Sequence, residues 1–477
     1  MKQSRRDFLC RTGQALGAAA FASGVKQFGL VNALAQSAPA DYKALVCIFL
    51  SGGNDGNNTV VPNDSAGYQA YSTVRNASGL ALAQSSLIPI TPPSIGAQFG
   101  LHPSLSPEVA DPTQQFKGLL PLWTAQKLAI VCNVGPLVAP MTRTQYQNNT
   151  VPKPYQLFSH SDQVAQQQTG ISNVRSQTGW GGRTADKTGG FNGGTILPMV
   201  ISVAGINIFN QGMTTSPLGI APAPTALNQV LVLNGFGSGA DETARRNSMD
   251  FLRTIDLTPA LIAATSNTTQ QALNIAQAFG VDPTLTTVFP TTTLGNQLKQ
   301  VAKVMKLNQT SLGLQRQIFF CTLGGFDTHQ NQLTSQVTLL GQLSQAMKAF
   351  YDATVELGID SRVTTFTLSD FGRTLQPSGS GGSVGTDHAW GNHLFVMGGA
   401  VKGGDFYGVA GSNGSVFPAL QLSGPNDTDT RGRWIPTTST DQYAATLASW
   451  YGLAAADLSY VFPLVGNFSP ATLGFMM

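Results

Sequence analysis

The chain has 477 residues, with 27 Lys and Arg against 24 Asp and Glu, so its formal net charge is +3; only 11% of residues are charged, whereas 42% are hydrophobic. This balance excludes an intrinsically disordered protein, which needs more charge and fewer apolar residues. No strict repeat is visible, which excludes a collagen or coiled-coil rod. A charge of +3 spread over this length also argues against a nucleic-acid partner.

Residues 1–35 have the three parts of a twin-arginine signal peptide. Arg5 and Arg6 stand in the sequence SRRDFL, a mildly apolar stretch follows, and Ala-Leu-Ala at 33–35 fits a cleavage site. We therefore expect the twin-arginine translocase to export the protein to the periplasm or out of the cell. The apolar stretch is too short for a stable membrane span, and no later segment reaches ~18 uninterrupted apolar residues.

Short apolar runs alternate with segments of helical periodicity in the rest of the chain. The runs are residues 45–50, 128–134, 317–323 and 363–368. Runs of this kind suit strands that are buried on both faces of a parallel sheet. Apolar residues spaced three and four apart in 294–305 and 340–350 predict helices between them. The pattern predicts one α/β domain over 36–477, with a doubly wound, mostly parallel sheet and a β-rich insertion at about 195–235.

Acidic residues follow three of the predicted strands, and histidines lie close to them in sequence. Asp55, Asp327 and Asp370 come just after strand ends, where open α/β sheets form ligand sites. His329 is two residues from Asp327, and a later loop contains Asp387, His388 and His393. Imidazole nitrogen and carboxylate oxygen are the donors of a divalent metal site of the Zn or Mn type. We therefore predict that these residues bind metal.

Two further features suggest roles for single residues. Arg373 follows the fourth strand and is a candidate to bind an anionic oxygen of a substrate, with a surface salt bridge as the alternative. Residues 381–385 match the G-x-S-x-G pattern, which makes Ser383 the candidate nucleophile of a serine esterase. That motif needs a strand before it and a helix after it, and here it lies within a Gly/Ser-rich loop.

Several segments together resemble the bacterial family called domain of unknown function 1501. They are FLSGGNDGNNTVVP, LHPSL, LFSHSDQ, GGFDTHQNQ, SDFGRT and GTDHAWGNHLFVMGGAVKGGDFYG, in this order along nearly the whole chain. The family in turn resembles the alkaline phosphatase and sulfatase superfamily. This resemblance implies an α/β core of the alkaline phosphatase-like type, two divalent metals held by Asp and His, and phosphoryl or sulfuryl transfer through a Ser, Thr or modified Cys.

The resemblance also assigns roles to individual positions. Asp55 is similar to the first-strand metal aspartate of the superfamily. Asp327 and His329 resemble its Asp/His pair, although the usual spacing is Asp-x-x-x-His. Asp370 resembles the aspartate of its Asp-His-Gly strand end, but Phe371 replaces the histidine. The following loop would supply the missing imidazole, from the Asp387-His388 pair or from His393.

The segment that resembles the superfamily's nucleophile helix begins near residue 159. Counting back from the Thr-Gly pair at 169–170 places His160 where the nucleophile should be. The resemblance therefore leaves two readings: Ser159 or Ser161 is the nucleophile, or His160 is another metal ligand.

The resemblance implies an exported, metal-dependent hydrolase that acts on a small anionic ester or on a sulfated or phosphorylated polymer. Histidine ligands favour one or two ions of Zn or Mn, with Ca and Mg left open. The alternative from another class is a non-catalytic envelope protein that retains the fold and a structural metal.

Overall fold

The computed structural model describes residues 41–477 except 196, 231–237 and 256. The segment predicted as a twin-arginine signal, 1–35, lies outside the described residues. Within those residues, no helix is long and apolar enough to cross a membrane.

A nine-stranded mixed sheet forms the centre of the fold, in the order β13-β5-β12-β9-β1-β8-β6-β7, with β14 paired to β5. All of its pairings are parallel except those of β12, which runs antiparallel to both β5 and β9. Its strands are β1 (Lys43–Ser51), β5 (Leu128–Gly135), β6 (Val200–Ser202), β7 (Leu218–Gly219), β8 (Arg316–Gly324), β9 (Val363–Ser369), β12 (Asn392–Gly398), β13 (Phe406–Tyr407) and β14 (Thr438–Ser439). The four predicted apolar runs are β1, β5, β8 and β9, which confirms the mostly parallel α/β sheet.

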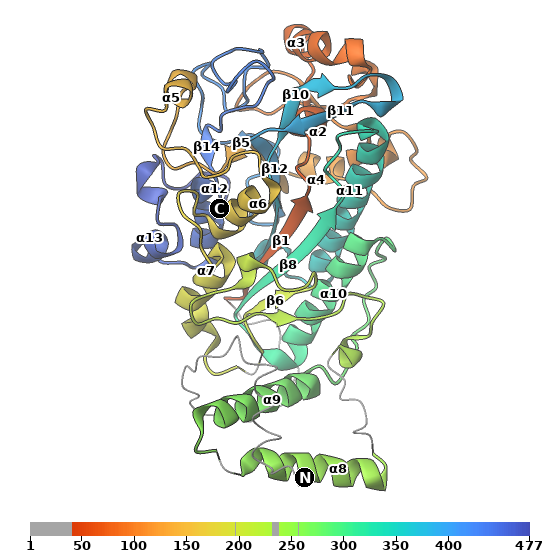
Figure 1. The fold of residues 1–477 in the computed structure, drawn as a ribbon. Coiled ribbons are helices and arrows are strands. Elements are labelled where there is room, and N and C mark those ends of the chain that lie inside the picture. Colours follow the sequence, from red (N-terminus) through yellow and green to blue (C-terminus); the bar gives the residue numbers. More distant parts are fainter. Residues whose placement is uncertain (1–40, 196, 231–237, 256) are drawn as a thin grey trace.

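Helices cover both faces of this sheet, which explains why its strands are continuously apolar. Alternate residues of β1 point to opposite faces: Val46 and Ile48 join one core, whereas Leu45 and Cys47 join the other. The first face packs against α10 (Thr293–Leu307) and α11 (Gln332–Glu356), as Figure 1 shows. The second packs against α7 (Trp180–Thr188) and α12 (Thr440–Tyr451). The doubly wound arrangement is thus confirmed.

Smaller elements surround the sheet. The helices are α2 (Gly56–Thr59), α3 (Ser65–Arg75), α4 (Leu120–Thr124), α5 (Arg143–Asn148), α6 (His160–Thr169), α8 (Ala240–Thr254), α9 (Ala260–Ala278) and α13 (Leu458–Val461). A three-stranded sheet contains β2 (Val60–Pro62), β3 (Ile88–Ile90) and β4 (Phe99–Leu101), and a hairpin contains β10 (Arg373–Ser378) and β11 (Gly385–His388).

The segment predicted as a β-rich insertion contributes to the edge of the main sheet. Its short strands are β6, which pairs in parallel with β8, and β7, which pairs with β6. Residues 231–237, at its end, lie outside the described part. The chain then continues into α8 and α9, which lie together at the end of the molecule away from α3 and β10 (Figure 1).

The carboxyl ends of three neighbouring strands lie at one edge of the sheet. In the register of the pairs, Ser51 at the end of β1 is opposite Gly324 of β8, and Leu50 is opposite Ser369 of β9. The segments that carry Asp327 and Asp370 therefore leave the sheet on either side of the end of β1. The polar residues converge at the carboxyl edge of the sheet, where the sequence predicts the functional site.

Candidate metal centre

The segment after β8 can approach the end of β1 closely because a glycine directly follows this strand. Gly52 has a φ of 115°, and a Cβ at this position would collide with the backbone nitrogen of Asp327. Only glycine adopts this conformation without strain and also leaves the space empty. The carboxylate of Asp327 is thereby held beside the ends of β1 and β9.

Three imidazoles converge on one oxygen of Asp327. Oδ1 of Asp327 lies 3.0 Å from Nε2 of His329, 3.4 Å from Nε2 of His160 and 3.4 Å from Nε2 of His388. The two Nε2 atoms of His329 and His388 are themselves 3.0 Å apart. These residues come from three separate parts of the chain: the segment after β8, the first residue of α6 and the last residue of β11.

In each of the three histidines, Nδ1 faces an oxygen acceptor. His160 Nδ1 lies 2.7 Å from Oδ2 of Asp370, His329 Nδ1 lies 3.3 Å from Oδ1 of Asp387, and His388 Nδ1 lies 2.8 Å from the carbonyl oxygen of Phe158. A neutral ring whose Nδ1 donates to such an acceptor has its lone pair on Nε2. His160 and His388 make hydrogen bonds of this kind, whereas the contact of His329 with Asp387 is an ion-pair distance. This is the arrangement in which metal-ligating histidines are held by outer partners.

The cluster therefore gathers lone pairs that need a cation. Nε2 of His160 is buried and has no hydrogen-bond partner among the described residues. One ligand atom from each of His160, Asp327 and His388 can be chosen so that all lie within 4.8 Å of one another. Ligand atoms around a tetrahedral zinc with bonds of ~2.0–2.1 Å lie roughly 3.3–3.4 Å apart, close to the separations above. The donors and their spacing fit one divalent ion.

The protonation of the cluster also favours a cation. Burial alone would raise the pKa of Asp327, but Arg373 and then the three histidines outweigh it, so this pKa is lowered and the carboxylate is charged. Burial lowers the pKa of His388, which keeps its ring neutral near pH 7. A charged carboxylate beside a neutral imidazole is the protonation state that binds a metal.

Arg373, which the sequence suggests as an anion-binding residue, holds Asp327 instead. Its side chain is fully buried, and Nη2 contacts Asp327 Oδ1. Its other nitrogens donate to the carbonyl oxygens of Gly53 and Thr386. Arg373 thus positions a carboxylate from the buried side of the cluster.

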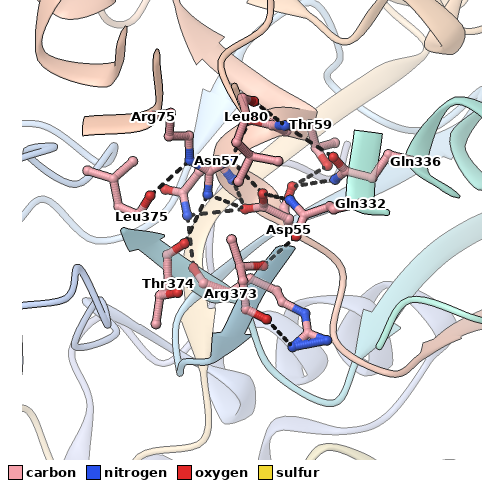
Figure 2. Close-up of polar contacts among 12 residues, drawn as sticks. Asp55, Asn57, Thr59, Arg75, Leu80, Gln332, Gln336, Arg373, Thr374 and Leu375 are labelled. Carbon is pink, nitrogen blue, oxygen red and sulfur yellow. Dashed lines mark hydrogen bonds and ion pairs between the residues drawn. The ribbon is translucent and has the colours of Figure 1, made fainter. Parts of the chain in front are cut away.

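Asp55, which the sequence assigns to the metal, lies in a different polar network. Its Oδ2 is 2.6 Å from Nη1 of Arg75 and 2.5 Å from Nε2 of Gln332, and Oδ1 accepts from Arg75 and Asn57. Figure 2 shows the carboxylate surrounded by these donors. The guanidinium of Arg75 thus occupies the position beside the Asp55 carboxylate where a metal ion bound to Asp55 would have to lie.

The remaining predicted ligands divide into two groups. Asp370 and Asp387 touch Nδ1 atoms and so orient His160 and His329. His393 stands apart: its Nδ1 accepts from the backbone of Asn133, and its ring stacks on Phe417 at 4.5 Å. Of the two candidates for the missing imidazole, His388 and not His393 faces the cluster.

The two serines beside His160 share one acceptor. Ser159 Oγ donates to Oδ2 of Asp162 at 2.7 Å, and Ser161 Oγ donates to the same oxygen at 3.3 Å. Ser161 is exposed, whereas Ser159 is part-buried at the start of α6. Both hydroxyls therefore have a carboxylate acceptor, the kind of partner that a nucleophilic serine uses as its base. The hydrogen bond from Ser159 lowers the pKa of this carboxyl.

Ser383, the nucleophile of the esterase alternative, lies in the turn between β10 and β11. The element before it is a hairpin strand, and the element after it is another strand rather than a helix. The strand-turn-helix that exposes a serine at a nucleophile elbow is therefore replaced by a β-hairpin.

Sequence reasoning did not identify several partners of the cluster. The ring of Phe371 lies 4.8 Å from that of His160 and 4.7 Å from that of His388, and forms an apolar wall. The carbonyl of Phe158 and the side chain of Gln332 were also missed. A contact made by a backbone carbonyl cannot be read from the sequence. Gln332 could have been noticed, because it is a polar residue at the start of a helix with an apolar face.

The fold and the cluster define the class: an α/β protein with a histidine-aspartate centre at the carboxyl edge of a mostly parallel sheet. Residues 42–418 match the family described as "Protein of unknown function (DUF1501)", and the chain belongs to this family. No curated protein matches the sequence significantly.

Among solved structures, similar chains include Ps i-CgsB in complex with k-i-k-neocarrahexaose, with 9% identity, a TM-score of 0.31 and coverage of 90% of this chain and 77% of that one. The 2-O GAG sulfatase BT1596 has 10% identity, a TM-score of 0.31 and coverage of 87% and 71%. Alkaline phosphatase from the Antarctic bacterium TAB5 has 10% identity, a TM-score of 0.26 and coverage of 76% and 92%. Likenesses this remote say nothing of the reaction.

Proposed function

We propose that the protein is a metal-dependent hydrolase of phosphate or sulfate esters. The observation that carries the proposal is the convergence of three Nε2 atoms on Oδ1 of Asp327, with every Nδ1 held by an oxygen. The donor set favours zinc or manganese over calcium or magnesium, which prefer oxygen ligands. His160, Asp327, His329 and His388 would hold the ion.

When bound, a divalent ion would lower the pKa of a coordinated hydroxyl or water and stabilise the negative charge that develops on the ester. The chain's own residues supply the orientation. Arg373 holds Asp327 from the buried side, and Asp370 keeps the lone pair of His160 on Nε2. Of the two candidate serines, Ser159 has the shorter hydrogen bond to Asp162 and is the hydroxyl that would attack.

Metal content and ester hydrolysis of the purified protein test the proposal. We expect about one zinc or manganese ion per chain and turnover of an aryl phosphate or an aryl sulfate. Asp327→Asn should lose both, because it removes the charge at the centre of the cluster. Asp111→Asn, at an exposed aspartate in a loop, is the matched control and should retain both. A wild-type protein without stoichiometric metal would refute the proposal, and a metal-loaded protein without turnover would favour the non-catalytic envelope role.

We also propose export by the twin-arginine translocase to the periplasm or beyond, on the basis of Arg5, Arg6 and the cleavage site at 33–35. Arg5→Lys combined with Arg6→Lys should leave the precursor in the cytoplasm, which fractionation and the size of the protein would show. Export of the double variant at the wild-type level would contradict this route.

A further inference from the structure

A buried glutamine at the start of α11 connects the two segments that carry the candidate ligands. Oε1 of Gln332 accepts from Thr386 Oγ1 at 2.5 Å and from Thr328 Oγ1 at 3.1 Å. Thr328 lies between Asp327 and His329, and Thr386 directly precedes Asp387 and His388. One side-chain oxygen thus joins a segment after β8 to a strand of the β10-β11 hairpin.

The orientation of the glutamine amide is determined by its surroundings. Nε2 of Gln332 donates to Oδ2 of Asp55, which only accepts hydrogen bonds when it is charged. Arg75 donates to both oxygens of the same carboxylate, so the charge is balanced although the pair is buried. The ion pair of Asp55 and Arg75 therefore fixes Nε2 on one side and leaves Oε1 for the two threonines (Figure 2 shows the ion pair and Gln332).

The backbone reinforces this connection. The nitrogen of Gln332 donates to the carbonyl of Val384, and the nitrogen of Thr386 donates to the carbonyl of Thr328. The hairpin can lie this close because Gly385 has no Cβ, which would collide with the backbone of His329. Two ligand-bearing segments therefore share one small contact region. The side chain of Gln332 bonds to both, as that of Arg373 does through Asp327 and the carbonyl of Thr386.

We propose that Gln332 is a positioning residue of the metal centre, coupling the buried ion pair of Asp55 and Arg75 to the segments that carry Asp327, His329 and His388. This inference rests on the proposed metal site, but not on turnover. Outer partners of metal ligands typically change affinity by about 10–100-fold when they are removed. Gln332 acts one step further out, through the backbone of both segments, and we expect an effect in the lower part of this range.

The matched control is Gln336, one turn further along α11. It is also buried, and it accepts from Asn58 and donates to the backbone carbonyl of Asp55, but it bonds to neither ligand-bearing segment. Gln332→Leu and Gln336→Leu each remove the hydrogen bonds of a buried glutamine from the same helix. A purely structural role predicts similar losses of thermal stability and no difference in metal affinity.

The experiment measures the affinity of the full chain for zinc by calorimetry, together with the thermal unfolding midpoint. We expect Gln332→Leu to weaken zinc binding about tenfold, while Gln336→Leu binds zinc as the wild type does. Thr386→Val should weaken binding in the wild-type background and have no further effect in Gln332→Leu, whereas Thr386→Ser, which retains the hydroxyl, should bind normally. These two threonine variants decide the question even if Gln332→Leu does not fold.

Wild-type zinc affinity in Gln332→Leu or in Thr386→Val would overturn this inference and leave the proposed function standing. An equal loss of zinc affinity in Gln336→Leu would do the same. A wild-type chain that binds no zinc would overturn the proposed function and the inference with it. A chain that binds zinc but hydrolyses no ester would remove only the hydrolase assignment, because the comparison of affinities does not depend on activity.

Discussion

Oδ2 of Asp370 lies 2.7 Å from Nδ1 of His160, while Oδ1 of the same carboxylate accepts from the backbone nitrogen of Gly52. The two oxygens join the amino end of α6 to the end of β1. This contact decides which nitrogen of His160 carries the proton, and so decides whether Nε2 has a lone pair to offer a metal.

Asp370→Asn should therefore weaken metal binding by about 10–100-fold, the usual effect of losing an outer partner. The amide oxygen would remain with Gly52, and the NH₂ group would face Nδ1 of His160, which would move the proton to Nε2. Calorimetry with zinc or manganese measures the change. Asp352→Asn, on the exposed side of α11, is the control. An unchanged affinity in Asp370→Asn would show that the tautomer of His160 does not matter.

The pairing of Asp55 with Arg75 predicts that the loss of Arg75 alone destabilises the protein more than the loss of both charges. Both side chains are completely buried. Arg75→Met should destabilise the protein by about 3–5 kcal/mol, because it leaves a buried carboxylate without its cation. Adding Asp55→Asn should restore part of this loss. Urea unfolding of the wild type and the two variants measures the free energies, and equal stability of Arg75→Met and the wild type would contradict the prediction.

The two serines at the start of α6 should differ in their effect on hydrolysis. Ser159 has the shorter hydrogen bond to Asp162, 2.7 Å against 3.3 Å, and is less exposed than Ser161. We expect Ser159→Ala to lower kcat by at least ~10²-fold with its metal retained, as for loss of a nucleophile. Ser161→Ala should stay within about tenfold of the wild type. Full activity in both variants would indicate that a water molecule attacks the ester.

His393 should make the protein less stable in acid. Burial lowers its pKa to about 3 in the folded chain, below the ordinary value of 6.5. The unfolded chain therefore binds the proton more strongly. The stability that this group contributes is complete above about pH 6.5 and is lost as the pH falls toward 3, by up to about 1.4 kcal/mol per pH unit.

His393→Gln removes this titration but keeps an acceptor for the backbone of Asn133. Urea unfolding at about pH 7 and about pH 5 should show a smaller loss of stability in the variant than in the wild type. His102, whose pKa burial lowers to about 4, titrates in both proteins and does not affect the comparison. Equal pH dependence in the two proteins would indicate that His393 is not buried as a neutral ring.

The strands and helices that build the central sheet follow from local patterns. The apolar run at 317–323 predicts β8, and the helical spacing at 294–305 predicts α10, because burial on two faces or on one face imposes a period on neighbouring residues. The position of Asp327 and Asp370 at the carboxyl edge follows from the same strands. Family membership also rests on the sequence alone, through the match over 42–418.

The sequence by itself thus determined the α/β sheet, the edge that holds the site and the residue types that gather there. Only the tertiary structure decided their partners. His160 meets Asp370 across 210 positions of the chain, and Asp55 turns to Arg75 instead of joining the cluster. Spacing along a chain constrains neighbours in one strand or helix, whereas the choice between a metal and a guanidinium depends on which charged group is buried beside the carboxylate.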